Sequence, residues 1–489
     1  MPMYSLNDME TIYKNNNGSI IHGDNLEYLA TAEENSVDSC ISDFPYAIEF
    51  MQKNWDSAKY WNVGQGKHGI FEGTGYSGKK RPSFYMNSTE DKLIFYDWCY
   101  ARAQALFPIM KPGGYVAIFG HAKTNHRMKC AFEDAGFKIV EEIDWIHCQG
   151  MPKNQDIGKL FDKAAGAERE IIGENPYASR QRNPMNGAVL MMNKTGWDYA
   201  KDLTITAPSS DLAKKWNGWK TAGLKPAHEQ ITIFQKPLDG TYINNIEKYG
   251  CGAMNIGACR VPIPQADIDT LNAKASKNPT TNYSDKADKI YGKFAKDIAV
   301  PANEMGRFPA NIVLDEYVAE LLDEQTGESK STGGAGRKSR IGRARKIYGA
   351  YQDKTNESYI NESLGGYGDA GGGSRLFTII KYHPKVSPSE RKLPNGERNP
   401  HVTLKPIGLI KWLIKLLTPV NGTTIDITAG SFTFGVACTQ VNLYENYNLK
   451  WIGVEIMNTK SEPYCEIGKQ RIEREIRNWE EEKLTNKEE

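Results

Sequence analysis

The sequence lacks the features that mark several protein classes. None of its eight cysteines forms a CxxC pair, which argues against a zinc site and a disulfide framework. None of its eight histidines belongs to an HExxH motif or another metal-ligand cluster, so no metal is expected. No apolar run reaches about 18 residues, and residues 1–17 are polar without an apolar core segment. These absences predict a cytoplasmic protein with reduced thiols and no membrane contact.

An excess of charge of one sign is also absent, since the formal net charge is only +1. A nearly neutral total does not decide whether the protein binds nucleic acid, because a binding groove needs local charge. Residues 329–352 supply local charge, with interleaved glycines and no acidic residue. A cationic loop of this kind suits a phosphate backbone, although an exposed loop without a partner explains it equally well. Its basic residues are Lys330, Arg337, Lys338, Arg340, Arg343, Arg345 and Lys346.

Alternating strand and helix patterns at both ends of the chain predict an α/β fold. Short apolar runs predict strands, and longer amphipathic stretches predict helices. Alternation at this spacing is typical of βαβ units on a mostly parallel sheet. The predicted strands are 19–22, 39–43, 115–119, 138–145, 423–426 and 450–454, and the predicted helices are 26–32, 91–110, 124–134, 407–417 and 434–440.

The middle of the chain is polar, glycine-rich and weakly periodic. We therefore expect three parts: residues 1–150 and residues 401–489 as the two halves of one α/β domain, and residues 151–400 as inserted segments. One sheet built from both ends of the chain, with a loop-rich lobe between them, follows from this division.

The first candidate site motif is Ser42-Asp43-Phe44-Pro45-Tyr46, which follows a predicted strand. The Asp43 carboxylate and the next backbone carbonyl could hold an amino group attached to an aromatic ring and draw its lone pair out of conjugation. Pro45 stiffens the turn, and Tyr46 offers a flat face for stacking a flipped-out base. Taken alone, the tetrapeptide Asp43–Tyr46 is a weak signal, and an ordinary strand-to-loop proline turn explains it better.

The second motif runs from Asp426 to Gly435 and reads as a strand, a small-residue turn and a helix. Such turns let a ligand approach the backbone at the edge of a parallel sheet. Asp426 could bind an ammonium group. Glu455 ends the next predicted strand, where an acid commonly binds ribose hydroxyls. An ordinary βα turn remains the alternative.

Taken together, the chain resembles the β-class DNA N4-cytosine/N6-adenine methyltransferases, in the form carried by phages and prophages. In that family a D-P-P-Y motif comes first, a target-recognition region lies in the middle, and an S-adenosyl-L-methionine (AdoMet) motif of the type D-P-F-x-G-S-G-T-T comes near the C-terminus. This sequence has the same order, and the resemblance covers most of residues 19–476. Further matching blocks are Trp219–Glu229, Tyr249–Ile256, Gly306–Asn311 and His401–Pro406.

The resemblance implies a Rossmann-like AdoMet-dependent methyltransferase sheet with permuted motif order and an inserted loop-rich target-recognition lobe. The implied activity is site-specific methylation of an exocyclic amino group of double-stranded DNA, a reaction of restriction-modification systems, by a family whose members often dimerise. Asp43 favours adenine N6, because serine is more usual at this position in enzymes that act on cytosine N4. The implied catalytic residues are Asp43, Phe44, Pro45 and Tyr46. The implied AdoMet-binding residues are Asp426, Thr428, Gly430, Phe432, Glu455, His401, Thr403 and Lys405. Trp55 joins the basic residues of 329–352 as a DNA contact.

The sequence also departs from the family pattern. Phe44 replaces the first proline of D-P-P-Y, and Phe432 replaces the second glycine of the AdoMet turn. If that glycine has a positive φ, the replacement costs about 1–2 kcal/mol. The Phe432 ring could instead stack on the cofactor adenine. Two alternatives to an active enzyme follow: a methyltransferase-like protein that binds DNA without turnover, and an enzyme that uses an altered cofactor.

Overall fold

The computed structural model describes residues 9–48, 56, 89–148, 150, 154–174, 204–265, 268–269, 306–330, 370–380, 391–394, 396–401 and 403–488. The predictions for Trp55 and for the basic residues between 331 and 369 lie outside the described residues. The chain divides into two compact units, one formed by Met1–His147 with His228–Glu489 and the other by Cys148–Ala227. Each unit is described by itself.

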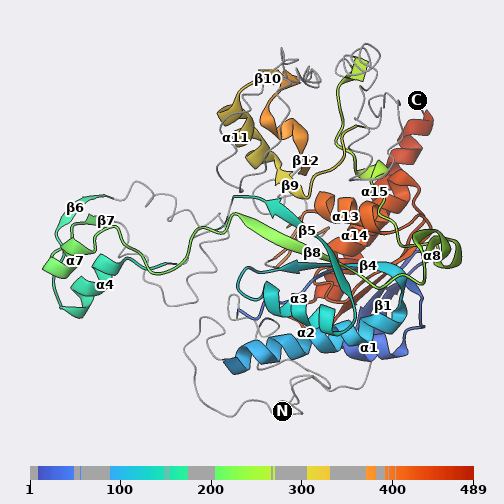
Figure 1. Ribbon diagram of the computed structural model, residues 1–489, viewed down its shortest axis with the longest axis horizontal. Helices are drawn as coiled ribbons and strands as arrows, with labels where there is room; N and C mark the ends of the chain where they lie inside the picture. The colour runs from blue at the N-terminus through green and yellow to red at the C-terminus, as the bar shows by residue number, and fades with distance from the viewer. Residues whose placement is uncertain are drawn as a thin grey trace, which may run out of the picture. The chain divides into compact units, whose positions relative to one another are not determined.

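The larger unit contains one sheet built from both ends of the chain and from three strands of its middle, β8, β9 and β12 (Figure 1). Its strands, in spatial order, are β1 (Glu10–Lys14), β2 (Gly18–His22), β14 (Lys450–Glu455), β13 (Thr423–Asp426), β3 (Val37–Asp43), β4 (Met110–Gly120), β8 (His228–Gln235), β5 (Lys138–Ile146), β9 (Ile312–Asp315) and β12 (Thr378–Ile380). The predicted mostly parallel α/β sheet is confirmed. The sequence patterns do not predict β1, β8, β9 and β12.

Strand direction matters for the site. The strands pair in parallel, except that β1 is antiparallel to β2 and β8 is antiparallel to both β4 and β5. Parallel strands present their carboxyl ends at one edge of the sheet, where ligands of open α/β sheets bind. Because β8 runs the other way, it presents its first residues at that same edge.

Helices cover both faces of the sheet (Figure 1). One face carries α1 (Asn25–Thr31), α2 (Thr89–Ile109) and α3 (Asn125–Asp134), and the other carries α13 (Ile407–Leu417), α14 (Thr433–Glu445) and α15 (Tyr464–Glu488). Side chains of β4 alternate between the two cores, as the period of a strand requires. Ala117 and Phe119 pack with α13 and α14, whereas Val116 and Ile118 pack with α2 and α3.

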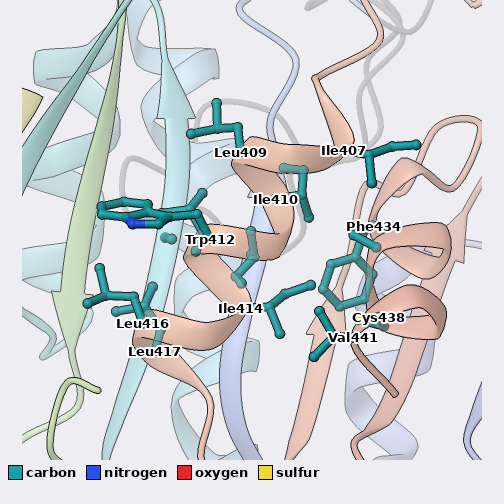
Figure 2. Close-up of a cluster of buried hydrophobic side chains, with 14 of the residues drawn as sticks. Ile407, Leu409, Ile410, Trp412, Ile414, Leu416, Leu417, Phe434, Cys438 and Val441 are labelled. Carbon is teal, nitrogen blue, oxygen red and sulfur yellow. The ribbon is translucent and has the colours of Figure 1, made fainter. Parts of the chain in front are cut away.

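Helix α13 is apolar on most of its surface, which is typical of a fully packed helix. Figure 2 shows its side chains meeting those of α14 in one cluster. Burying each large aliphatic side chain contributes about 1.5–3 kcal/mol, so this cluster holds α14 and the turn before it firmly on the sheet. The labelled members are Ile407, Leu409, Ile410, Trp412, Ile414, Leu416 and Leu417 of α13 and Phe434, Cys438 and Val441 of α14.

The remaining elements of the larger unit are short. They are α8 (Tyr242–Tyr249), η6 (Gly257–Cys259), α11 (Glu316–Thr326), β10 (Ser329–Lys330), β11 (Ala370–Gly371) and η8 (Gly373–Leu376). No helix among the described residues is both long and apolar enough to span a bilayer.

The smaller unit packs α4 (Ile157–Ala164) against α7 (Asp211–Lys215) beside an antiparallel pair, β6 (Ile171–Glu174) and β7 (Thr204–Thr206). The Asp162 carboxylate organises it, because it pairs with Arg169 and accepts hydrogen bonds from the backbone N–H of Ser209 (3.1 Å) and Ser210 (2.8 Å). A hollow in this unit is lined by residues that include Asn154, Trp219 and Lys220.

Candidate active site

The two predicted motifs lie on adjacent strands. Parallel pairing of β13 with β3 sets Thr424 beside Ser39 and Ile425 beside Cys40. Asp43 and Asp426 therefore end neighbouring strands at the same edge of the sheet, and Glu455 ends the next strand, β14. The acids predicted from opposite ends of the sequence are thereby brought together.

Direct hydrogen bonds join the two motifs. Ser42 Oγ donates to Asp426 Oδ1 over 2.6 Å and accepts from the backbone N–H of Ile427 over 2.9 Å. Thr428 Oγ1 donates to the backbone carbonyl oxygen of Asp43 over 3.1 Å. The predicted cofactor residue Thr428 thus ties the AdoMet-type turn to the residue proposed to bind the target base.

Asp43 lies in a compact polar cluster. Lys405 Nζ donates to Asp43 Oδ2 over 2.6 Å and lies 3.2 Å from Glu229 Oε2. Tyr46 Oη donates to Asp43 Oδ1 over 3.0 Å. The resemblance implied a cofactor role for Lys405, whereas the structure places its ammonium on the carboxylate of the first motif. Glu229 comes from the start of the antiparallel strand β8.

The charges in this cluster follow from its contacts. Burial by itself lowers the pKa of Lys405, but the carboxylates of Asp43 and Glu229 outweigh it and the pKa is raised. Burial by itself raises the pKa of Glu229, but Lys405 and then His147 outweigh it and the pKa is lowered. Lys405 is therefore a cation and Glu229 an anion at neutral pH.

Phe44, which replaces the first proline of the family motif, points into the protein core. Its ring packs edge-on against Trp98, with centroids 5.1 Å apart, and tilted against Phe132 at 6.0 Å. The added bulk therefore fills the layer between the sheet and α2 and does not crowd Asp43. Pro45 is half-buried and lies between Phe44 and Tyr46 in the turn.

Asp56 holds the turn after the motif. Ala47 has a φ of 58°, which is unfavourable for a residue with a Cβ. Asp56 is buried, and its two carboxylate oxygens accept the backbone N–H groups of Ala47 (2.8 Å) and Ile48 (3.3 Å). These bonds offset the strain and fix the position of Tyr46, whose ring lies 5.6 Å from that of His121.

The second motif places two buried carboxylates side by side. Asp426 Oδ1 accepts the backbone N–H of Thr428 (3.0 Å), and Glu455 accepts those of Gly430 and Met457, both over 2.7 Å. Burial raises the pKa of Asp426 to about 7 and that of Glu455 to about 8. Among the described residues no lysine or arginine compensates either acid. This donor set fits a cationic ligand such as AdoMet, which carries an ammonium and a sulfonium.

Gly430 occupies a position that only glycine fits. Its φ is 53°, and an added Cβ would lie 2.6 Å from His401 Nε2. The His401 ring packs edge-on against Tyr464, with centroids 4.7 Å apart. The predicted cofactor residues His401 and Gly430 are therefore in contact. Thr403 belongs to the same segment as His401 and is half-buried.

Phe432 takes the strained conformation that its alignment with a family glycine suggests. Its φ is 60° and its ψ is 38°, a left-handed geometry that costs about 1–2 kcal/mol for a residue with a side chain. Its ring is fully buried in a slot against Gly453 and Gly468, where an added Cβ at Gly453 would lie 2.5 Å from the ring. The ring therefore does not lie where it could stack on a cofactor adenine, and only its backbone borders the turn.

Three side chains that contact the predicted site are not predicted from the sequence: Glu229, His147 and Asp56. Glu229 lies in a block that matches the family, but its role depends on the direction of β8, which the sequence does not reveal. His147 follows β5 and places Nε2 3.9 Å from Glu229 Oε1.

A mostly parallel sheet with helices on both faces, one inserted antiparallel strand and acids at the ends of β13 and β14 is the Rossmann-like fold of AdoMet-dependent methyltransferases. A family model described as DNA methylase, covering N6 and N4 methyltransferases, matches residues 37–469. The chain belongs to this DNA methylase family, which confirms the resemblance seen in the sequence.

Individual relatives are more distant. The type II methyltransferase M.HindIII of Haemophilus influenzae is 24% identical over 251 residues, which are 48% of this chain and 64% of that protein. The chain thus spans less than two thirds of that relative. Among solved structures, the cytosine-N4-specific PvuII DNA methyltransferase is 14% identical with a TM-score of 0.36, covering 96% of this chain and 97% of that one. The M1.HpyAVI–SAM complex is 12% identical with a TM-score of 0.31, covering 93% and 99%.

Proposed function

We propose that the protein transfers the methyl group of AdoMet to an exocyclic amino nitrogen of DNA, with adenine N6 as the target. One observation carries this proposal. The acid suited to an amino group, Asp43, and the acid suited to a cationic cofactor, Asp426, end adjacent strands and are linked through Ser42 and Thr428. A methyl donor and an amino acceptor bound at these two acids would meet at one sheet edge.

The reaction needs orientation and electrostatics from the protein. The Asp43 carboxylate and the Phe44 carbonyl accept hydrogen bonds from the target amino group, which turns its lone pair away from the ring. Tyr46 stacks on the flipped-out base, and Pro45 limits the freedom of the turn. AdoMet, when bound, supplies a methyl group that is already activated, so holding the partners in line is the main task of the protein.

The predicted cofactor residues contact different parts of AdoMet. Asp426 pairs with the cationic part of AdoMet, and Glu455 serves the ribose end. Gly430 allows close approach to the backbone, and the segment of His401 and Thr403 borders the turn. The raised pKa values of Asp426 and Glu455 support this assignment. A bound cation would stabilise the two charged carboxylates, which no lysine or arginine among the described residues does.

The contacts with DNA are also proposals. Residues 151–400 would carry target recognition, with Trp55 and the basic residues Arg337, Lys338, Arg340, Arg343, Arg345 and Lys346 on the phosphate backbone. In the smaller unit, Trp219 is 60% exposed and lies beside Lys220, which suits contact with a base or a phosphate. A homodimer on double-stranded DNA remains part of this proposal. The target assignment rests on Asp43, since serine is more usual in cytosine N4 enzymes.

Mass spectrometry of nucleosides tests the reaction. Unmethylated amplified DNA of high sequence diversity is incubated with the protein and AdoMet, digested and analysed. N6-methyladenine is expected, N4-methylcytosine would correct the target, and no new nucleoside would reject the activity. Asp43→Asn should abolish the product. Asp239→Asn is a matched control, because Asp239 also accepts from a lysine (Lys248, 2.7 Å) and a tyrosine (Tyr249, 2.9 Å), away from the site.

A second candidate function is DNA binding without turnover, and the strained turn at Phe432 favours it. Titration calorimetry with AdoMet separates the two. Absence of heat, with DNA binding intact, would support the binding protein. A nucleoside mass other than that of a methyl adduct would instead point to an altered cofactor.

A further inference from the structure

The Lys405 ammonium lies between two carboxylates, and the proposed function gives it no role. Nζ lies 2.6 Å from Asp43 Oδ2 and 3.2 Å from Glu229 Oε2. The lysine side chain is only 8% exposed, and its ammonium lies 4.9 Å from the centre of the Phe119 ring. A buried ammonium with two anionic neighbours can shift its main contact from one to the other by a small movement.

The position of Lys405 conflicts with the task proposed for Asp43. Asp43 already accepts from Lys405 and from Tyr46, so an incoming amino group must compete with a cation for the carboxylate. A cation in contact with the carboxylate also makes it a weaker proton acceptor. The amino nitrogen must lose a proton when it gains a methyl group, and Asp43 is the nearest base.

We propose that Glu229 takes over the Lys405 ammonium when the target amino group enters, which releases Asp43 to accept first a hydrogen bond and then the proton. The inference rests on the proposed function and assigns Lys405 and Glu229 as positioning residues. The side chains of Asp43 and Glu229 are 23% and 30% exposed, so both can be reached from outside.

The proton balance is simple. The amino lone pair forms the new N–C bond while the S–C bond between the sulfonium and the methyl group breaks and leaves its electron pair on sulfur. One N–H bond then breaks with its electron pair remaining on nitrogen. The proton passes to Asp43, which becomes a neutral carboxylic acid and returns the proton to solvent after the product leaves. The groups that face this step are Tyr46 and His121 on the ring side, His147 behind Glu229, and Asp56 and Asp426 beyond the turn.

A stability cycle tests whether either carboxylate alone can hold the ammonium. Thermal unfolding is measured for Asp43→Asn, Glu229→Gln and the double variant. Each single variant leaves Lys405 one anionic partner, so each should lower Tm only slightly. The double variant leaves a buried cation unpaired and should lower Tm by more than the two single shifts together. Additive shifts would show that the ammonium is not shared and would overturn the inference.

A kinetic double-mutant cycle tests whether the Lys405 ammonium moves from Asp43 to Glu229 during the reaction. Glu229→Gln should slow single-turnover methyl transfer by on the order of 10²-fold, because Lys405 then stays on Asp43, while the Kd for AdoMet is unchanged. Adding Glu229→Gln to Lys405→Met should cause no further loss, because Glu229 acts through the lysine. In Lys405→Met the rising limb of the pH–rate profile should move to higher pH. Without its neighbouring cation, Asp43 keeps its proton up to a higher pH. A purely structural role would not move this limb.

The control variant is Glu445→Gln. Glu445 also binds two lysines, Lys411 (3.1 Å) and Lys415 (2.8 Å), but lies at the end of α14 away from the site, so its rate should equal that of the wild type. If the wild type is active and Glu229→Gln is as fast as Glu445→Gln, the movement of the ammonium to Glu229 is rejected and the proposed function stands. If the wild type transfers no methyl group to any DNA, both are rejected.

Discussion

The Ser42 hydroxyl, on the neighbouring strand, stabilises the charged form of the Asp426 carboxylate, to which it donates a hydrogen bond over 2.6 Å. Ser42→Ala should raise the pKa of Asp426 further and weaken AdoMet binding by about tenfold, the value of one hydrogen bond to a charged group. Titration calorimetry measures the change. Ser36→Ala is the control, because Ser36 Oγ donates only to the carbonyl of Glu33 just before β3. Equal affinities for the two variants would show that the Ser42 bond has no role in binding.

The acids of the second motif should make stability depend on pH in an unusual direction. Burial raises the pKa of Asp426 to about 7 and that of Glu455 to about 8, whereas the pKa of either side chain in an unfolded chain is about 4. Between these values the folded protein binds more protons than the unfolded one, so stability falls as pH rises from about 5 to 8. Tm measured without cofactor should show this fall, and Asp426→Asn should reduce it.

AdoMet should reverse this trend. A cation bound beside the two acids lowers their pKa values, so binding releases protons and strengthens as pH rises through about 7 to 8. Calorimetry in two buffers of different ionisation enthalpy counts the released protons. Affinity that does not change over this pH range would contradict the assignment of Asp426 to the cationic part of the ligand.

The positive φ of Phe432 predicts that glycine gives a more stable protein than alanine at this position, the reverse of the usual order. Removing its ring empties a filled slot and should cost about 3–5 kcal/mol. Because φ at this position is 60°, Phe432→Gly should be more stable than Phe432→Ala by about 1 kcal/mol. Phe434, in the helix that follows, should show the usual order, with alanine more stable than glycine by about 1 kcal/mol. Chemical denaturation of the four variants checks both pairs. The same order at both positions would refute the strain.

Asp56 should affect the reaction without affecting the cofactor. Asp56→Ala removes two hydrogen bonds that hold Ala47 and Ile48, so Tyr46 loses its fixed position and the single-turnover rate should fall by tenfold or more, about the value of one charge-assisted bond. The Kd for AdoMet should stay the same. Ala47→Gly, which tolerates a φ of 58°, should recover part of the rate in the Asp56→Ala background. An equal loss of AdoMet affinity would indicate general damage instead.

The sequence predicts the parts of the fold that local patterns determine. The apolar runs before Asp43 and Asp426, each followed by an acid and a turn, were sufficient to place both strand ends correctly. The partner of Lys405 could not be predicted, because it depends on how the segment before α13 approaches β3. Glu229 was missed because strand direction is a property of the whole sheet. The orientation of Phe432 depends on Gly453 and Gly468, which give no sign in the sequence that they form a slot.

The position of β14 between β2 and β13 also bears on how the chain is made. On the ribosome, β2 is synthesised early and has to wait for residues 450–455 before its parallel edge is covered. A nascent or truncated chain therefore exposes unpaired strand edges, which favour aggregation. Premature termination anywhere before β14 should therefore leave a product that aggregates instead of folding with half a site.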